Sequence, residues 1–567
     1  MSKKLNVNKQ KLEKLEKELE EIKNKPTTNK KYQNDLEQKI KEIYIDKTEA
    51  AIIRSKCRWF KEGEAPSKYF FQLEKSNGEK KLWNRIKKEN GTYKTDIDSI
   101  IEEQINFYYK LLNTEGWDSE SGELLLAEVQ CKLDDCDVNM LDRDISDQEI
   151  YLAVMSLKPN KSPGEDGILS TFYQIYWDII KNEFSKVIKH IFHRATLCDS
   201  QTKGVISLIH KGNEREDIKN WRPLTMLNND YKIIAKILAE RLKKVLPKLI
   251  HPDQKGFVKG RNISDANRLI QDIIDYADNE DLEGAIIFLD QQKAFDRIEW
   301  GWVEATLKRF NFGKKYCDWI KMLLIKSKTC IKTNGFVSKY FPISRSARQG
   351  CPIAPLLYVL QIEPMACAIR QNPQIKGILI PNKDEKIECK INMFADDTQL
   401  FNKDEESIIN SFNVLEIYEK ASGAKINFSK TKGRFIGKSK GKTPNFKKIQ
   451  WIKTNIKTLG VNHGYGIDTN AIWLEKIEKI KNSLHVWKTR NLTFKGKTLI
   501  IKNLIIPIIG YEIEMRGIPD IYAKQINDIV WSFIWDNKLN KIDRNVCCLS
   551  KNEGGMNMIN IFNFIKS

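Results

Sequence analysis

Two short apolar runs carry the clearest strand patterns in the chain. The first, GAIIFL at 284–289, is rich in β-branched and aromatic residues and ends at Asp290, which is typical of a buried strand. The second, INMFADDTQLF at 391–401, carries Asp396 and Asp397 between apolar residues, which predicts a hairpin with both acids at its tip. If the strand and the hairpin are neighbours, three carboxylates converge on one spot.

Helical patterns surround this region. At 12–22, Leu and Ile recur at spacings of three and four among Lys and Glu, which indicates either a coiled-coil seam or a helix packed on its own domain. From 146 onward helical patterns alternate with short strands such as GVISLIH at 204–210, and past 454 the chain is predicted to be mostly helical. Residues 114–140 are acidic and predict a loop-like boundary.

The charge balance adds a partner class to this picture. The chain has 95 Lys and Arg against 75 Asp and Glu, a formal net charge of +20. Such an excess indicates a polyanionic partner, with nucleic acid as the first candidate, although a Lys-rich proteome gives the same composition. No apolar stretch approaches the roughly 20 residues of a spanning helix and no signal peptide is visible, so we expect neither membrane insertion nor secretion. The 11 cysteines form no CxxC pair, which predicts a reducing compartment without a zinc site.

One stretch combines cations with aromatic rings. CRWFKEGEAPSKYFFQLEK at 57–75 includes Arg58 and Lys68, interleaved with Trp and Phe. Rings stack on bases while cations hold phosphates, so this stretch is a candidate contact for template RNA, with Arg58 and Lys68 as phosphate ligands. The same rings are equally typical of an ordinary core, and the two interpretations remain open.

The converging acids predict a metal site. An ionised carboxylate at the end of an apolar strand is costly unless something neutralises it. Carboxylate oxygens are the ligands that Mg²⁺ prefers, and two such ions about 3.5–4 Å apart stabilise the attacking and leaving oxygens of phosphoryl transfer. Asp290, Asp396 and Asp397 are therefore candidate ligands of two Mg²⁺ ions, with Mn²⁺ as an alternative.

The ordered motifs of the chain resemble one family, the reverse transcriptases of non-LTR (LINE-type) retrotransposons. The resemblance covers roughly residues 50–560. It is carried by LKPNKSPGEDGILSTFYQIYW, GVISLIHKG, NWRPLTMLNNDYKIIAKILAERL, HPDQKGFVKGRNISDA, FLDQQKAFDRIEW, ARQGCPIAPLL, FADD, SGAKINFSKTK and KTLGV, in that order. The chain departs from the family in having Phe394, where Tyr is more common at the first position of the FADD signature.

The resemblance implies an α+β right-hand polymerase of fingers, palm and thumb with a helical N-terminal extension. The implied segments are a helical or coiled-coil-like start at 1–56, an extension that contacts template RNA at 57–145, fingers at 146–270, a palm with the catalytic acids at 271–455, a helical thumb at 456–540, and the start of a truncated C-terminal region at 541–567.

The resemblance also implies roles for single residues. Asp290, Asp396 and Asp397 match the catalytic metal-binding triad, and the carbonyl of Gln291 adds a candidate ligand. The residues that match the nucleotide site are Lys211 and Arg222 as cations for the triphosphate, Phe295 as the bulky ring that excludes a 2′-hydroxyl, Gln349 beside the incoming nucleotide, and Gly350, which lets the backbone come close.

Three lysines compete for one role, that of proton donor to the departing pyrophosphate. Lys430 is the first candidate, with Lys425 and Lys432 as alternatives. Leu459 and Gly460 match the turn that grips the primer in nucleic-acid binding, and the helical segment 472–511 matches a thumb that clamps the duplex.

The implied function is RNA-directed DNA polymerisation: template RNA is copied into cDNA from a DNA primer and dNTPs, giving an RNA–DNA hybrid, in target-primed reverse transcription. We expect a ribonucleoprotein of cytoplasm and nucleus. No endonuclease or zinc knuckle is visible, which indicates either a truncated piece of a polyprotein or a minimal polymerase. The alternatives are a group II intron or bacterial-type reverse transcriptase and a catalytically silent, domesticated RNA-binding protein, and the intact acids argue against the second.

Overall fold

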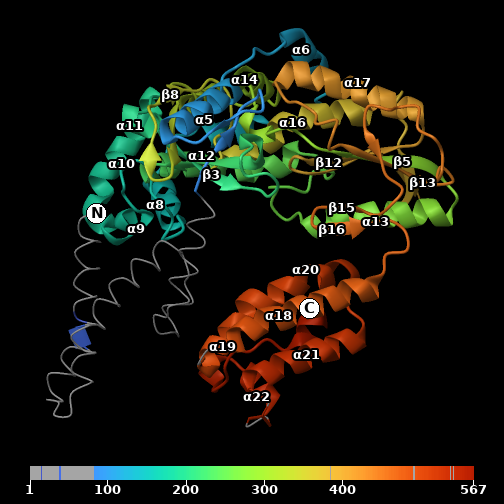
Figure 1. Ribbon diagram of the computed structural model, residues 1–567. Coiled ribbons are helices and arrows are strands. Elements are labelled where there is room, and N and C mark those ends of the chain that lie inside the picture. The colour runs from blue at the N-terminus through green and yellow to red at the C-terminus, as the bar shows by residue number, and fades with distance from the viewer. Residues whose placement is uncertain are drawn as a thin grey trace. The chain divides into compact units, whose positions relative to one another are not determined.

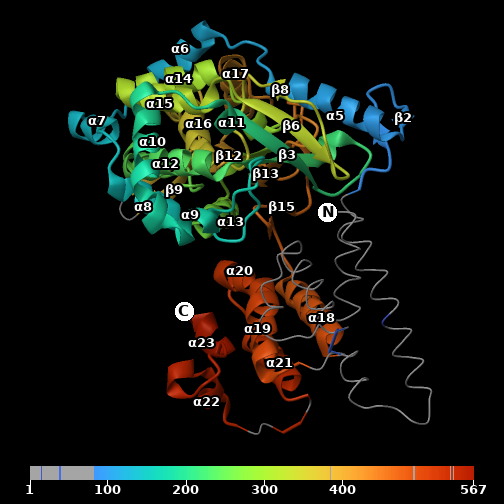
Figure 2. The same ribbon diagram turned by 90° about the vertical axis from the view of Figure 1, so that its left-hand side faces the viewer.

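The computed structural model describes residues 82–382, 385–488, 492–536, 538–539 and 542–566, with positions 15, 38 and 39. The described chain falls into two compact units, a larger one that ends at Ile467 and a smaller one that begins at Asp468. Figures 1 and 2 show both units, which are described separately below. The predicted N-terminal helices and the candidates Arg58 and Lys68 lie outside the described residues.

The central sheet of the larger unit has the order β11-β12-β5-β13-β14. Its strands are β5 (Glu283–Leu289), β11 (Ile391–Phe394), β12 (Asp397–Asn402), β13 (Lys432–Gly437) and β14 (Gln450–Trp451). Strand β5 runs antiparallel between β12 and β13, in a register that pairs Thr398 with Leu289 and Lys432 with Phe288. The predicted strand, the predicted hairpin and their adjacency are confirmed.

Helices cover both faces of this sheet, as Figure 1 shows. Ile286 and Phe288 of β5 pack against α13 (Ile263–Asn279), whereas Ile287 and its alternate neighbours belong to the main core with α16 (Ala354–Gln371) and α17 (Glu405–Ser422). Successive side chains of a strand point to opposite faces, so a strand buried on both faces has a continuous apolar sequence. This burial explains why the run 284–289 contains no polar residue.

A second sheet holds the order β4-β3-β6-β7, and β8 also pairs with β6. Its strands are β3 (Lys203–His210), β4 (Trp221–Leu227), β6 (Lys328–Thr333), β7 (Phe336–Val337) and β8 (Phe341–Pro342). Ile206, Trp221 and Ile331 of this sheet form a separate core with Tyr108 of α5 (Ile97–Leu112). The sheet therefore has its own apolar support beside the main core.

The remaining elements of the larger unit are mostly helices. They are α8 (Asp147–Met155), α9 (Ser170–Ile175), α10 (Trp177–Arg194), α11 (Asp199–Thr202), α12 (Asn229–Leu249), α14 (Trp300–Arg309) and α15 (Lys314–Leu324), with the hairpins β1 (Ile86–Lys87)–β2 (Tyr93–Lys94), β9 (Ile378–Asn382)–β10 (Glu385–Cys389) and β15 (Ile456–Thr458)–β16 (Val461–His463), and 3₁₀ turns at Ile218–Asn220 and Ala294–Asp296.

The prediction of a loop-like boundary at 114–140 is wrong. This stretch contains α6 (Ser119–Ala127) and begins α7 (Asp135–Asp142), and Leu125 is buried in the main core. The acids that suggested a loop include helix N-caps: the Asp118 side chain accepts hydrogen bonds from the first turn of α6, and Asp134 does the same for α7. Capping acids mark helix starts, which an overall count of charge does not reveal.

The smaller unit is helical from Thr469 onward. Its elements are α18 (Thr469–Lys488), α19 (Phe494–Ile500), a π-helical turn (Ile501–Ile505), α20 (Ile506–Arg516), α21 (Asp520–Ile534), α22 (Arg544–Cys548), a 3₁₀ turn (Lys551–Glu553) and α23 (Ile561–Lys566). Trp473, Ile509 and Val530 lie in its apolar core. No helix in the described part of the chain is long and apolar enough to cross a membrane.

A buried arginine holds the region before α8 onto α12. Arg241 is 1% exposed and donates hydrogen bonds to the carbonyl oxygens of Leu141 and Arg143, at 2.6 Å each, and to both oxygens of Glu149. Burial alone would raise the pKa of Glu149, but Arg241 overcomes this effect and the pKa falls to about 2. The charge of Arg241 is therefore matched within the protein.

We predict that Arg241→Ala lowers the free energy of unfolding by about 3–5 kcal/mol, because it leaves the Glu149 carboxylate without its buried partner. Urea denaturation followed by circular dichroism measures the change. Arg143→Ala is the matched control, since the exposed Arg143 side chain also approaches Glu149, at 3.4 Å, and we expect a change below about 0.5 kcal/mol. Equal losses in the two variants would contradict the prediction.

Candidate active site

The hairpin tip between β11 and β12 carries two of the three predicted acids. Phe394 pairs with Asp397, so Ala395 and Asp396 form the turn, with Ala395 at φ +59°. The buried side chain of Gln254 fixes this turn by accepting a hydrogen bond of 2.8 Å from the Ala395 amide. The tip is therefore held by the segment that precedes α13.

The register of the sheet brings the third acid to the same edge. Thr398 pairs with Leu289, so the next positions along the two strands are Asp397 and Asp290. Burial raises the pKa of Asp396, with a smaller contribution from the charge of Asp290. Partial desolvation, and then the charges of Asp396 and Asp290, raise the pKa of Asp397 to about 6, although its side chain is exposed at the strand end. The three predicted acids thus repel one another electrostatically.

The loop 422–432 holds Asp290 in place. The side-chain amide of Asn427 donates a hydrogen bond of 2.9 Å to the Asp290 carboxylate, and the Asn427 backbone amide donates one of 2.8 Å to the Asp290 carbonyl oxygen. The loop is also tied to the next residues, since the Gln292 amide donates to the carbonyl oxygen of Lys425. Asn427 was not among the sequence candidates, and its position three residues before Lys430 in SGAKINFSKTK is the only local signal for it.

The same loop carries the competing lysines. Lys430 is exposed, and its charge acts on Lys211. Lys425 is held by an ion pair of 2.8 Å with Glu115, and Lys432 lies in β13, paired with Phe288. Lys430 is therefore close enough to Lys211 for the two positive charges to repel each other.

A cavity of about 320 Å³ lies beside the acids. It gathers predicted residues from five separate stretches of the chain. Its lining includes Lys211, Arg222, Gln291, Phe295, Gln349, Gly350 and Asp396, together with Lys293 and Asp296, which sequence reasoning missed. The cavity is therefore cationic on the side of the second sheet and acidic on the side of the hairpin tip.

The two predicted cations come from the hairpin β3–β4. Arg222 pairs with Ile209, two residues before Lys211, so the two cations are diagonal neighbours across the two arms. Burial lowers the pKa of Lys211, as does the charge of Arg222, whereas Asp296 and Asp396 act in the opposite direction. Two cations in one partly desolvated place favour an anionic occupant.

Phe295 and Gly350 shape the wall of the cavity. The Phe295 ring stacks on Tyr358 at a centroid distance of 4.4 Å, which fixes its orientation. Gly350 has φ +125°, and a Cβ at this position would lie 2.2 Å from the Thr225 carbonyl oxygen of β4. The close approach predicted for Gly350 is therefore an approach to strand β4, which leaves no room for a side chain.

Beneath the cavity lies a buried acid. Asp296 is 2% exposed and accepts a hydrogen bond of 3.0 Å from the side-chain amide of Gln349, while its other carboxylate oxygen has no partner among the described residues. Burial raises the pKa of Asp296 to about 6 and lowers that of the adjacent Lys293 to about 8. The hydrogen bond to Asp296 holds the Gln349 side chain from behind.

Leu459 and Gly460 do not line the cavity. They form the two-residue turn between β15 and β16, with φ of +46° and +83°. Positive φ at both central positions is the signature of a type I′ hairpin turn. The predicted turn is confirmed, whereas its contact with a primer stays a prediction.

The donor set of the acids suits a hard divalent cation, since neighbouring carboxylate charges contribute to the raised pKa values of Asp396 and Asp397. Nevertheless, no group of three His, Cys, Asp or Glu residues in the described ranges has the geometry of a formed metal site. The residues fit the ion in chemistry, and the structure shows no ligand geometry.

Comparison with known proteins identifies the region that contains the cavity. Residues 209–463 match the family described as "Reverse transcriptase (RNA-dependent DNA polymerase)". These residues form a reverse transcriptase domain. Asp290, Asp397 and Lys430 lie within it, and so do all the candidates that line the cavity, Asp396 included.

The relatives of the reverse transcriptase domain are proteins of mobile elements. The "Transposon TX1 uncharacterized 149 kDa protein" of Xenopus laevis is 31% identical over 516 residues, which cover 90% of this chain and 39% of the relative. The "Retrovirus-related Pol polyprotein from type-1 retrotransposable element R2" of Popillia japonica is 25% identical over 53% of this chain and 40% of the relative. The resemblance to non-LTR retrotransposon reverse transcriptases is confirmed. The chain spans about two fifths of the length of these relatives.

We predict that Asp397→Asn raises the melting temperature in the absence of divalent cations. A carboxyl whose folded pKa of about 6 exceeds its ordinary value of 3.8 makes the folded protein less stable as the pH rises through 6. The gain in melting temperature should therefore be present at pH 7.5 and shrink by pH 4.5. It corresponds to at most about 1 kcal/mol in the free energy of unfolding, because the group is exposed. Calorimetry at the two pH values measures it. Glu102→Gln, an exposed acid on α5, is the control, and an equal gain at both pH values would contradict the prediction.

Proposed function

We propose that this chain is an RNA-directed DNA polymerase that copies template RNA from a DNA primer with dNTPs. The observation that carries the proposal is the cavity between Lys211 and Arg222 on one side and Asp396 on the other. A dNTP has a polyanionic triphosphate for the cations and a reacting phosphate for a metal held by the acids. The relative named "Probable RNA-directed DNA polymerase from transposon BS", from Drosophila melanogaster, is 26% identical over 39% of this chain and 24% of its own length.

In the proposed right-hand layout, the central sheet with its acidic edge is the palm and the sheet with β3 and β4 belongs to the fingers. The helices from Thr469 onward are the thumb, and the turn at Leu459 and Gly460 contacts the primer. The compact unit that ends at Ile467 includes this turn, which supports a thumb that begins after β16 rather than at 456.

The proposed chemistry assigns each residue one task. The primer 3′-hydroxyl gives up its proton to solvent as it attacks the α-phosphate, the bond to the β-phosphate breaks, and Lys430 gives a proton to the departing pyrophosphate. Asp290, Asp396 and Asp397, with the Gln291 carbonyl as a further candidate ligand, would hold divalent cations, which would supply positive charge to the reacting phosphate. Lys211 and Arg222 hold the triphosphate, and Phe295 lies under the sugar.

The proposed cellular role is target-primed reverse transcription by a ribonucleoprotein in cytoplasm and nucleus. The relatives from retrotransposable elements and transposons support this role over a group II intron type. An RNA-binding protein without activity has no physical need for three repelling acids at a sheet edge, so their presence supports the enzyme.

We predict that Asp396→Asn abolishes primer extension on an RNA template, with a loss of at least about 10³-fold, because the transition-state charge loses its metal ligand. Template affinity, measured by fluorescence anisotropy, should change less than about two-fold. Extension near the wild-type rate by the Asn variant would contradict the assignment of Asp396. Wild-type protein without extension on RNA or DNA templates, in either Mg²⁺ or Mn²⁺, would contradict the proposed function itself.

We predict that Phe295→Ala relaxes sugar selection, because removal of the ring opens space for a 2′-hydroxyl. The ratio of dNTP to rNTP incorporation, from single-turnover rates, should fall roughly 10- to 100-fold. This corresponds to a loss of about 1.4–3 kcal/mol in the free energy of discrimination. Phe295→Tyr is the matched control, since it keeps the ring that stacks on Tyr358 and should keep the ratio. An unchanged ratio in the Ala variant means that another group selects the sugar.

A further inference from the structure

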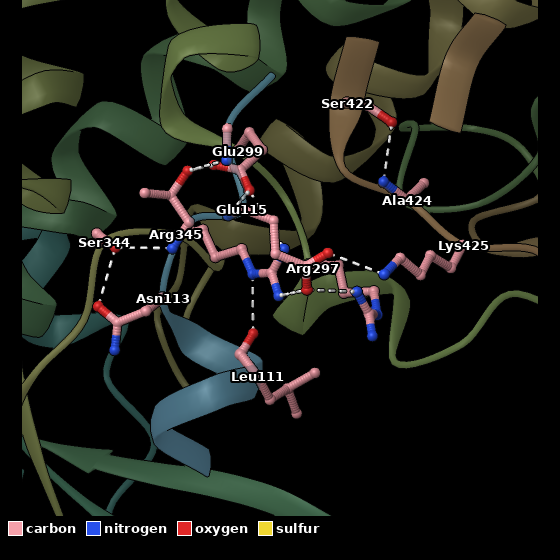
Figure 3. Close-up of polar contacts among 12 residues, drawn as sticks. Leu111, Asn113, Glu115, Arg297, Glu299, Ser344, Arg345, Ser422, Ala424 and Lys425 are labelled. Atoms are coloured by element: carbon pink, nitrogen blue, oxygen red, sulfur yellow. Dashed lines mark hydrogen bonds and ion pairs between the residues drawn. The ribbon is translucent and has the colours of Figure 1, made fainter. Parts of the chain in front are cut away.

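A cluster of charged side chains lies next to the proposed site without lining its cavity. Its centre is Arg345, whose side chain is fully buried. Arg345 donates hydrogen bonds to the Leu111 carbonyl oxygen at 2.9 Å, to Glu299 at 3.2 Å and to Glu115 at 2.8 Å (Figure 3). A buried guanidinium requires such partners, so these acids are held in defined places.

Glu115 connects this buried arginine to the surface. One of its carboxylate oxygens accepts from Arg345 and from Arg297, and the other accepts a hydrogen bond of 2.8 Å from Lys425. Figure 3 shows the Glu115 side chain between Arg345 and Lys425. The bond from Lys425, and then the charge and hydrogen bond of Arg345, lower the pKa of Glu115 to about 2, so the carboxylate stays ionised.

The partners of Glu115 belong to the loops that carry the proposed catalytic groups. Lys425 lies in the loop 422–432, two residues before Asn427, which holds Asp290. Arg297 lies two residues after Phe295 in the chain, and Arg345 lies four residues before Gln349. The loop with Phe295 and the loop with Gln349 also bond to each other, since the Ala347 amide donates to the Phe295 carbonyl oxygen at 2.9 Å. Glu115 therefore contacts all three loops.

We propose that Glu115 is a positioning residue for the polymerase reaction: through Lys425 it clamps the loop 422–432 so that Asn427 and Lys430 keep their places beside Asp290. This inference rests on the proposed function. Glu115 lies outside the matched domain at 209–463, in the stretch that sequence patterns had marked as a boundary. It touches neither the cavity nor the acids, and it acts through the loop alone.

An exposed ion pair by itself contributes little, because ordering two long side chains offsets most of its attraction. The pair of Glu115 and Lys425 differs because one partner is already fixed: Arg345 holds the carboxylate from the buried side. Loss of the Glu115 charge leaves Arg345 paired with Glu299, which is 2% exposed. The fold therefore retains its buried ion pair, and the local effect on the loop is separable from global stability.

The matched control is an ion pair of the same kind elsewhere. Lys442 and Glu283 lie 3.1 Å apart with side-chain exposures of 48% and 44%, against 46% and 50% for Lys425 and Glu115. Glu283 begins β5, whereas Asp290 follows the other end of that strand. Glu283→Gln therefore removes an equivalent surface carboxylate at a distance from the three loops.

The experiment combines hydrogen exchange with single-nucleotide kinetics on the full chain. We expect Glu115→Gln to raise the exchange rate of peptides covering 422–432 about three- to ten-fold, the range that an anchored surface pair represents. With primer and template saturating, the maximal rate of incorporation should fall about five- to twenty-fold. The apparent dNTP affinity should stay within about two-fold of the wild-type value, and the melting temperature within about 2 °C. Lys425→Met should reproduce both effects, and the double variant should be no worse than either single one.

Glu283→Gln should change neither exchange of the loop nor the rate. Unchanged exchange at 422–432 in Glu115→Gln overturns the clamp, and so does a loss that appears only as weaker dNTP binding. Additive losses in the double variant also overturn it, because they show that Glu115 acts apart from Lys425. The exchange measurement needs no activity, so it tests the clamp even if wild-type protein extends no primer, a result that contradicts only the proposed function.

Discussion

Electrostatic repulsion among Asp290, Asp396 and Asp397 is the constraint on which the rest of the larger unit depends. An edge with three acids is tolerable only if positive charge lies across from it. Lys211 and Arg222, whose charges oppose the rise in the pKa of Asp396, come from a different sheet. The fold must therefore hold two sheets at a defined separation. The Thr225 amide bonds to the Gln349 carbonyl oxygen at 2.7 Å, and Gly350 permits this contact because it has no side chain.

Polar groups beneath the cavity follow from the same constraint. Asp296, with one carboxylate oxygen that has no partner in the described part of the chain, is unfavourable in a core, where an apolar residue would pack without a desolvation cost. Its position is intelligible if it keeps the Gln349 amide fixed at the cavity wall, since a side chain that must present one orientation needs a partner behind it. Glu115 is held in the same way, because the buried Arg345 fixes its carboxylate beside the loops.

Sequence patterns predicted the parts of this site that depend on local order. The strand before Asp290 and the acidic hairpin tip follow from hydrophobic patterning, the turn at Leu459 and Gly460 follows from the family resemblance, and all three are present. Asp296 and Glu115 could not be predicted in this way, because their significance arises from contacts with residues more than 50 positions away in the chain. The prediction of a loop at 114–140 was wrong because Asp118 and Asp134 cap helices that begin in this stretch.

The larger unit extends beyond the matched domain, and this has a physical consequence for what can work alone. Trp83 stacks on Trp221, the residue beside Arg222, at 4.4 Å, and Leu125 and Ile150 belong to the same core as the sheet that carries the acids. Arg241 inside the domain satisfies carbonyl oxygens that lie before it. A fragment limited to 209–463 would expose these apolar faces and leave Arg241 without its partners. Residues 82–208 therefore belong to the framework that sets the distance between the cations and the acids, although the family match does not include them.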